Sequence, residues 1–151
     1  MPEDLQLKTK KVYLDTSEES RDAIIRMRQV LNLKNRQAYF IAVALGFKYG
    51  RRVEKFKKSS VGLPRIENLR NQDIVMMSAI QLATTGSPES LLDHEAMCDL
   101  TEQFAEGGGL LLISSGVLEQ GPEATKKWLT KELKQAMDGL PEPKSGPEDE
   151  E

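Results

Sequence analysis

Apolar residues recur at steps of three and four over most of the chain, and this spacing predicts a mainly α-helical protein. The first helix is expected over residues 17–31, where Thr16 and Glu19 have the spacing of a capping box. Asn35 and Ser87 are the residue types that begin later helices. The later helices are expected over residues 36–50, 72–85, 88–106 and 122–138. With the first helix, the chain is expected to form about five.

A short strand is expected before the first helix, at residues 8–15 (KTKKVYLD). Val12, Tyr13 and Leu14 favour a strand, and their alternation gives it two distinct faces. A strand followed by two helices with a four-residue turn, here 32–35, is the order of a ribbon-helix-helix unit. That fold is an obligate dimer whose paired strands enter the major groove of DNA. The pattern therefore predicts a ribbon-helix-helix-like N-terminal part, although the glycine usual in the turn is missing.

A ribbon-helix-helix unit would bring two sets of side chains to DNA. Along the strand, Thr9, Lys11 and Tyr13 would point outward toward the bases. The first turn of the second helix would meet a phosphate, because the amide groups at a helix N-terminus attract anions. The residues expected there are Lys34, Asn35 and Arg36.

The second helix is apolar on every side. Residues 38–47 (AYFIAVALGF) carry no charge, and a helix of this kind is buried on more than one face. A domain this small has little core with which to cover all of these faces, so burial against a second copy of the chain is the simplest arrangement. We therefore expect a homodimer whose interface includes Phe40, Ile41, Ala44 and Leu45.

A dense basic cluster follows that helix directly. The chain as a whole is acidic, with a formal net charge of −3, yet residues 46–58 (GFKYGRRVEKFKK) hold six cations and one acid. Residues 1–60 carry 14 Lys and Arg and 7 Asp and Glu, whereas the remainder carries 7 and 17. Such a split favours either a polyanion partner for the basic half or a fold in which the basic half packs on the acidic half. The candidate phosphate-binding cations are Lys48, Arg51, Arg52, Lys55, Lys57 and Lys58.

Charge and composition divide the chain into three parts. Residues 1–58 form the ribbon-helix-helix-like basic region, and residues 59–138 form an acidic helical region packed on it. Residues 139–151 are rich in proline and acids, so we expect a disordered tail that folding does not require. The single cysteine and the polar first residues favour a cytoplasmic protein, and no run is apolar enough to span a membrane.

No catalytic or metal-binding constellation stands out in the sequence. His94 and Cys98 are four residues apart, but they are the only His and Cys, and two ligands do not make a metal site. The glycines 107–109 lack the lysine of a phosphate-binding loop, and the stretch GGGLLLI fits either a strand or a short buried helix. We therefore expect no cofactor, no metal and no enzymatic activity, and an enzyme that uses His94 is the weakest alternative.

Two stretches of the chain resemble a family of small proteins. They are QAYFIAVALGFKYGRRV, residues 37–53, and EQFAEGGGLLLI, residues 102–113. Both are similar to segments of the proteins encoded beside bacterial and archaeal DNA phosphorothioation (dnd) genes, which read AAAIGYKNGRR and EEYANGGLEIL. The resemblance covers residues 36–113 and leaves the N-terminal strand and the last helix outside it. It implies an accessory role in DNA modification or restriction, a Gly-Arg-Arg that meets DNA or a partner subunit, and a helix with glycines at a packing contact in the second stretch.

Together these patterns predict a cytoplasmic, mostly helical homodimer that binds DNA without catalysing a reaction. The alternative is an adaptor or scaffold subunit of a defence complex, in which the basic cluster docks on an acidic protein surface. The salt dependence of DNA binding separates the two, because each phosphate contact releases counterions.

Overall fold

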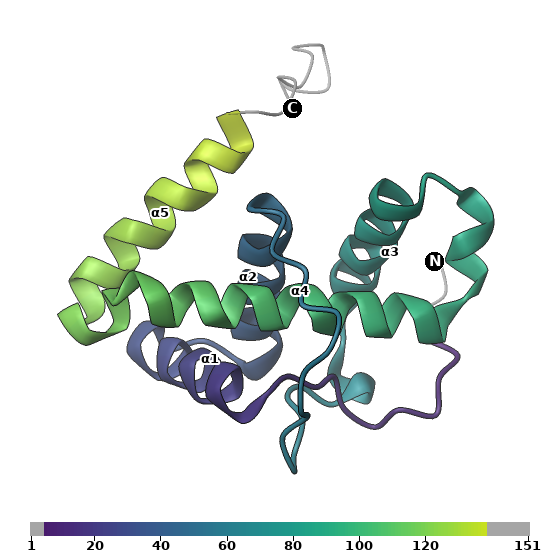
Figure 1. Ribbon diagram of the computed structural model, residues 1–151, viewed down its shortest axis with the longest axis horizontal. Helices are drawn as coiled ribbons and strands as arrows, with labels where there is room; N and C mark the ends of the chain where they lie inside the picture. Colours follow the sequence, from purple (N-terminus) through teal and green to yellow (C-terminus); the bar gives the residue numbers. More distant parts are fainter. Residues whose placement is uncertain (1–4, 139–151) are drawn as a thin grey trace, which may run out of the picture.

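A long helix, α4, lies at the centre of the molecule, and three of the other helices pack against it (Figure 1). The computed structural model describes residues 5–138, with side chains to residue 134, and it confirms the mainly α-helical fold predicted from the sequence. The helices are α1 (Glu18–Leu31), α2 (Asn35–Lys48), α3 (Asn71–Thr85), α4 (His94–Ser115) and α5 (Pro122–Asp138). Between them lie the short 3-10 turns η1 (Ile66–Asn68), η2 (Pro88–Leu92) and η3 (Val117–Gln120).

The ends of the first two helices follow ordinary capping chemistry. Ser17, not Thr16, caps α1, because its hydroxyl accepts a hydrogen bond from the Ser20 amide at 3.3 Å. The N-cap therefore lies one residue later than the predicted Thr16. Just beyond α2, Gly50 takes a φ of 62°, the left-handed conformation that glycine adopts most readily. Both helix ends lie within two residues of their predicted positions.

The predicted N-terminal strand is wrong. In the part of the chain that the structure describes, the segment 8–15 contributes one antiparallel bridge, between Tyr13 and Arg65. Its backbone bonds to a later segment of the same chain, since the Leu14 amide donates to the Pro64 carbonyl at 3.0 Å. Because the chain's own residues occupy these backbone groups, they are not available for a ribbon shared with a second copy. The ribbon-helix-helix-like part is therefore not supported.

The apolar helix α2 is buried inside one chain, mostly against α4. A Cβ at Gly108 of α4 would lie 1.7 Å from the carbonyl oxygen of Ala42. A Cβ at Gly46 of α2 would lie 2.0 Å from that of Phe104, so only glycine fits at these backbone contacts. The buried residues of α2 are Ala38, Tyr39, Phe40, Ala42, Val43, Leu45 and Gly46. Residues 102–113 thus belong to a helix with glycines at a packing contact, as the family resemblance implied.

This packing removes the reason for expecting a dimer through α2. Within a single chain Phe40 is 6% exposed and Leu45 is 1% exposed, while Ile41 and Ala44 are half-buried. Apolar residues lie on more than one side of the helix because α4, α1 and α5 all pack against it, although the side chain of Phe47 stays exposed. The homodimer therefore stays a prediction. The apolar faces of α2 no longer support it, because most of them are buried within one chain.

The single helix predicted over residues 88–106 is replaced by the turn η2 and by α4. Asp93 separates the two, because its carboxylate accepts a hydrogen bond from the Ala96 amide at 3.0 Å and caps α4. The helix then runs through the glycines 107–109 and ends before Gly116, whose φ is 67°. α4 is therefore long enough to contact α1, α2 and α3 along its length.

One apolar core joins the two predicted regions of the chain. It contains residues from both sides of position 58, among them Ile24, Leu45, Met77 and Leu112. The tail predicted to be disordered, residues 139–151, lies outside the described residues. Between residues 5 and 138, no helix has the length and apolar character needed to cross a membrane.

Candidate nucleic-acid interface

The basic cluster forms an extended segment that crosses α4 (Figure 1). This segment, residues 51–58, is called the basic strap below. At its start, the Arg51 amide donates a hydrogen bond to the Gly46 carbonyl at 2.8 Å. Just past its end, the Ser59 amide donates to the Thr16 carbonyl at 2.9 Å. The basic strap is therefore fixed to the fold at both ends.

The underside of the basic strap packs on α4. The Val53 amide donates to the carbonyl of Gln103 at 3.2 Å, and the side chains of Val53 and Phe56 are half-buried. A Cβ at Gly107 would lie 1.7 Å from the Arg51 carbonyl oxygen, so the strap lies directly on the helix at this point. The backbone is held while the charged side chains of the strap remain outside.

All five cations of the basic strap are exposed, and Lys58 alone among them forms ion pairs within the described chain; the other four are Arg51, Arg52, Lys55 and Lys57. Arg52 donates through Nε to Oε1 of Gln103 at 2.6 Å, and within the described residues its charge has no acidic partner. The side chains of Arg51, Lys55 and Lys57 make no hydrogen bond or ion pair with any residue between 5 and 138. An extended segment of this length spans at most about 28 Å. It is long enough to face several phosphates of a duplex.

Four other residues predicted to contact DNA are held in ion pairs. The closest pairs are Lys11–Glu102 at 3.4 Å, Arg36–Asp73 at 3.3 Å, Lys48–Glu132 at 3.0 Å and Lys58–Glu102 at 3.5 Å. In each pair the cation comes from the first sixty residues and the acid from the remainder, so part of the basic half does pack on the acidic half. The contact of these four cations with DNA stays a prediction, but the fold already gives them a structural role.

The sequence analysis missed two buried carboxylates on α4. Glu102 accepts a hydrogen bond from the Asp15 amide at 2.8 Å, and Glu106 accepts from both the amide and the hydroxyl of Ser17 at 2.7 Å. Their spacing of four residues places them on one face of the helix. They fasten the segment before α1 to α4. The one signal in the sequence is that they are the only charges between residues 100 and 118.

Burial raises the pKa of the Glu102 carboxyl, although the Asp15 amide and the charges of Lys11 and Lys58 act in the opposite direction. For Lys11, burial lowers the pKa, but the attraction of Glu102 and the hydrogen bonds of the ammonium group outweigh burial, and the pKa is raised. Burial also raises the pKa of the Tyr39 hydroxyl, which donates to the Asp15 carbonyl at 2.9 Å.

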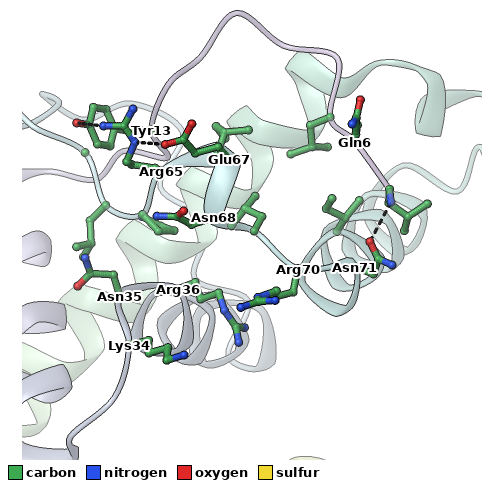
Figure 2. Close-up of a pocket in the computed structure, with 18 of the residues that line it drawn as sticks. Gln6, Tyr13, Lys34, Asn35, Arg36, Arg65, Glu67, Asn68, Arg70 and Asn71 are labelled. Atoms are coloured by element: carbon green, nitrogen blue, oxygen red, sulfur yellow. Dashed lines mark hydrogen bonds and ion pairs between the residues drawn. The ribbon is translucent and has the colours of Figure 1, made fainter. Parts of the chain in front are cut away.

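A cleft of about 1140 Å³ opens near the first turns of α2 and α3 (Figure 2). The connector that lines it begins at Val61, three positions after the last residue of the basic strap. Four residues predicted to contact DNA line this cleft: Tyr13, Lys34, Asn35 and Arg36. Three arginines that the sequence analysis did not single out also line it: Arg21, Arg65 and Arg70. The fold thus gathers cations that are far apart along the chain, and we call this site the basic cleft.

His94 and Cys98 have different surroundings in the fold. Nδ1 of His94 accepts a hydrogen bond from the Lys8 amide at 2.7 Å, which gives the ring a structural role. Cys98 is fully buried, and burial raises the pKa of its thiol to about 12, so the thiol is protonated near neutral pH. In the described part of the chain, His, Cys, Asp and Glu side chains form no group of three that could hold a metal ion.

No protein-family model, curated protein sequence or solved structure matches the chain. The assignment of a function therefore depends on the arrangement of the chain's own charged residues. That arrangement has three parts: an exposed basic strap, a basic cleft, and cations paired with acids inside the fold.

Proposed function

We propose that this protein is a non-catalytic, nucleic-acid-binding accessory protein that contacts the phosphates of duplex DNA through its basic strap. The observation that carries the proposal is the exposure of Arg51, Lys55 and Lys57 without an acidic partner in the described chain. Arg52 adds a fourth exposed charge, which is held in place by Gln103. Exposed cations contribute little to folding, so a partner that carries negative charge explains them better than stability does.

The shape of the basic strap suits phosphate contacts that do not depend on base sequence. Its backbone is fixed by the bonds of Arg51 and Val53, so binding would order only the long side chains. Four phosphate contacts would release about 3.6 counterions, since each contact contributes about 0.9 to the slope of log affinity against log salt. This dependence on salt is the property that the experiment below measures.

The family resemblance of residues 36–113 supplies the biological setting of the proposal. The segment similar to AAAIGYKNGRR ends in Arg51 and Arg52, which are the first two cations of the basic strap. A protein that holds DNA beside a modification or restriction enzyme needs affinity for the backbone more than it needs base recognition. We therefore propose that the protein acts in the cytoplasm as an accessory factor of a DNA modification or restriction system.

The test is a fluorescence anisotropy titration of a labelled duplex of about 20 base pairs at salt concentrations between about 50 and 200 mM. The variant changes Arg51, Lys55 and Lys57 to Gln. We expect weaker binding to every duplex and a slope that is flatter by about 2.7. The matched control changes Lys127, Lys131 and Lys134 of α5 to Gln, which removes the same charge from another exposed surface.

The control variant should keep most of the wild-type slope. Circular dichroism shows whether both variants retain the helical fold. An unchanged slope in a folded strap variant would contradict the proposal. The basic strap would then be assigned to an acidic protein surface, and the protein to an adaptor role in a defence complex.

A further inference from the structure

The basic cleft is a second charged site, and it is separate from the basic strap. Besides the first turns of α2 and α3, its walls include the connector 61–70 and Tyr13 (Figure 2). Its volume of about 1140 Å³ is far larger than a bare ion needs. Small-molecule sites typically measure about 300–1,000 Å³, so the basic cleft can take an organic ligand.

The side chains of the basic cleft give it an excess of positive charge. Five cations line it, against one acid, Glu67. Two of these cations are paired: Arg65 lies 2.8 Å from Glu67, and Arg36 lies 3.3 Å from Asp73. The other three, Arg21, Lys34 and Arg70, have no side-chain partner among the described residues.

Arg21 contributes a guanidinium group to the lining of the basic cleft. Its Nε is buried and has no hydrogen-bond acceptor among the described residues, as is also true of Arg28, which does not line the cleft. A buried donor without an acceptor costs about 1–3 kcal/mol, so such groups are rare in a folded protein. An anion in the cleft would give the Arg21 guanidinium group, which lines it, a partner of opposite charge.

Lys34, Arg36 and Arg70 converge at one end of the basic cleft. Figure 2 shows their side chains turned toward the same space, from the first turn of α2 and from the residue before α3. Asp73 already accepts hydrogen bonds from Arg36 and from the Arg70 amide, at 3.3 Å and 2.8 Å. Cations gathered in this way repel one another, and a phosphate group would relieve the repulsion through charge-assisted hydrogen bonds.

The rest of the lining suits a nucleobase more than a second phosphate. The exposed amides of Asn35 and Asn68 can both donate and accept, as the polar edge of a base requires. Tyr13 adds an aromatic ring, with the guanidinium group of Arg65 5.4 Å from its centroid. A ligand that fits this lining has a phosphate group at one end and a polar aromatic ring at the other, and a nucleotide has both.

We propose that the basic cleft binds a nucleotide through its phosphate group, with Lys34, Arg36 and Arg70 around the phosphate and Asn68 near the base. The nucleotide is either free or the 5′-phosphorylated end of a single strand, since the two share this chemistry. This site does not depend on the basic strap, so either proposal can fail without the other.

Isothermal titration calorimetry of the full chain tests the site with three small probes: adenosine 5′-monophosphate, adenosine and inorganic phosphate. We expect one saturable site for the monophosphate and at least about tenfold weaker binding of adenosine, because charge-assisted hydrogen bonds are lost. A short single-stranded oligonucleotide, with and without a 5′-phosphate, distinguishes the two sources. Tighter binding of the phosphorylated oligonucleotide than of the monophosphate assigns the site to a strand end, and the reverse order assigns it to a free nucleotide.

The variant that removes the phosphate contacts is Lys34→Gln with Arg70→Gln. Both residues are exposed, and we expect the dissociation constant of the tighter phosphorylated probe to rise at least about tenfold. Asn68→Asp is a second variant, which places a negative charge in the basic cleft without removing a cation. It should weaken binding of the phosphorylated probes and leave the melting temperature unchanged. The strap variant, with Arg51, Lys55 and Lys57 changed to Gln, should bind the monophosphate as the wild type does.

Three results would overturn the nucleotide site. The first is the absence of saturable binding of any phosphorylated probe at millimolar concentration. The second is equal affinity for adenosine and its monophosphate. The third is wild-type affinity in both cleft variants, which would place the bound nucleotide elsewhere on the molecule.

Discussion

The cations at the ends of the basic cluster and the cations in its middle have different surroundings. Lys48, the last residue of α2, lies 3.0 Å from Glu132, and Lys58, at the far end of the basic strap, lies 3.5 Å from Glu102. The side chains of these two acids are 10% and 2% exposed. The cations between the ends are exposed and lack an acidic partner in the described chain. A run of charge that looks uniform in the sequence is therefore anchored at its ends and open in its middle.

The burial of the partner decides what each cation does. An ion pair with a buried acid cannot be broken without leaving that charge in a poorly solvated place, which destabilises the fold strongly. An exposed cation contributes little to stability and remains available to a partner. We therefore expect changes at the two groups of cations to give opposite results. Anchored residues should affect unfolding, and residues of the open middle should affect binding.

The largest effect should come from Glu102→Ala, which removes the acid that anchors the far end of the basic strap. The change deprives the Asp15 amide of its acceptor, and it deprives Lys11 and Lys58 of their closest partner. We expect the free energy of unfolding to fall by about 2–4 kcal/mol, measured by urea denaturation. The control is Asp99→Ala on the same helix, which removes a more exposed partner of Lys11 at 3.7 Å.

The control should change the free energy of unfolding by less than about 0.5 kcal/mol. If Glu102→Ala were as stable as the control, the anchoring role of the buried acid would have to be abandoned. The two groups of cations would then differ only in exposure.

The next effect concerns Lys48, at the N-terminal end of the basic cluster. Lys48→Met keeps the aliphatic stem but removes the ammonium group, which donates to the Glu132 carbonyl at 2.7 Å and to its carboxylate at 3.0 Å. We expect a loss of about 1–2 kcal/mol in the free energy of unfolding. The slope of DNA affinity against salt should stay at the wild-type value, because the charge of Lys48 is already used within the chain. A flatter slope for this folded variant would move Lys48 into the group that contacts phosphate.

A smaller effect should appear in the pH dependence of stability. The pKa of Glu102 is raised by burial above its ordinary value of 4.5, so the folded protein holds this proton more tightly than the unfolded chain does. The stabilisation from this proton is complete below the ordinary pKa, and it is lost as the pH rises through the raised pKa. Glu102→Gln cannot lose a proton at this position. We therefore expect the free energy of unfolding of the wild type, relative to the variant, to decrease with rising pH.

Urea denaturation of both proteins at several pH values between about 4 and 8 checks this. Titration of the other carboxyl groups cancels to a first approximation in the difference between the two proteins. A difference that increased with pH would mean that the pairs with Lys11 and Lys58 outweigh burial, and that the pKa of Glu102 is lowered in the folded protein.

Local patterns predicted most of the helices but not the way they meet. α1, α3 and α5 lie within one residue of their predicted bounds, because each has an apolar stripe and clear end signals. The strand at residues 8–15 was wrong because its partner is a distant segment that offers one bridge, at Arg65. The course of α4 through glycines 107–109 depends on the close approach of α2, which helical periodicity does not contain. The family resemblance, not the periodicity, implied that contact.

The two candidate sites also differ in how far the sequence alone could predict them. The basic strap was evident from the density of charge, because its cations are neighbours in the sequence. The basic cleft was not evident, since Arg21 lies in α1 whereas Arg65 and Arg70 lie in the connector 61–70. Lys34 and Arg36 were named because a helix begins beside them, and that expectation placed them correctly at the start of α2. The sequence predicted the start of α3 but not its position on the other side of the same cleft.

The smallest change tests the open middle of the basic strap with a single residue. Lys55 is exposed and has no side-chain partner between residues 5 and 138, so Lys55→Gln should leave the free energy of unfolding within about 0.5 kcal/mol of the wild type. If Lys55 meets one phosphate, the slope of log affinity against log salt should become flatter by about 0.9. Lys127→Gln on α5 is the matched control, and it should leave both quantities unchanged. A change in stability without a change in slope would mean that Lys55 serves the fold, and the contrast between anchored ends and an open middle would not hold at this residue.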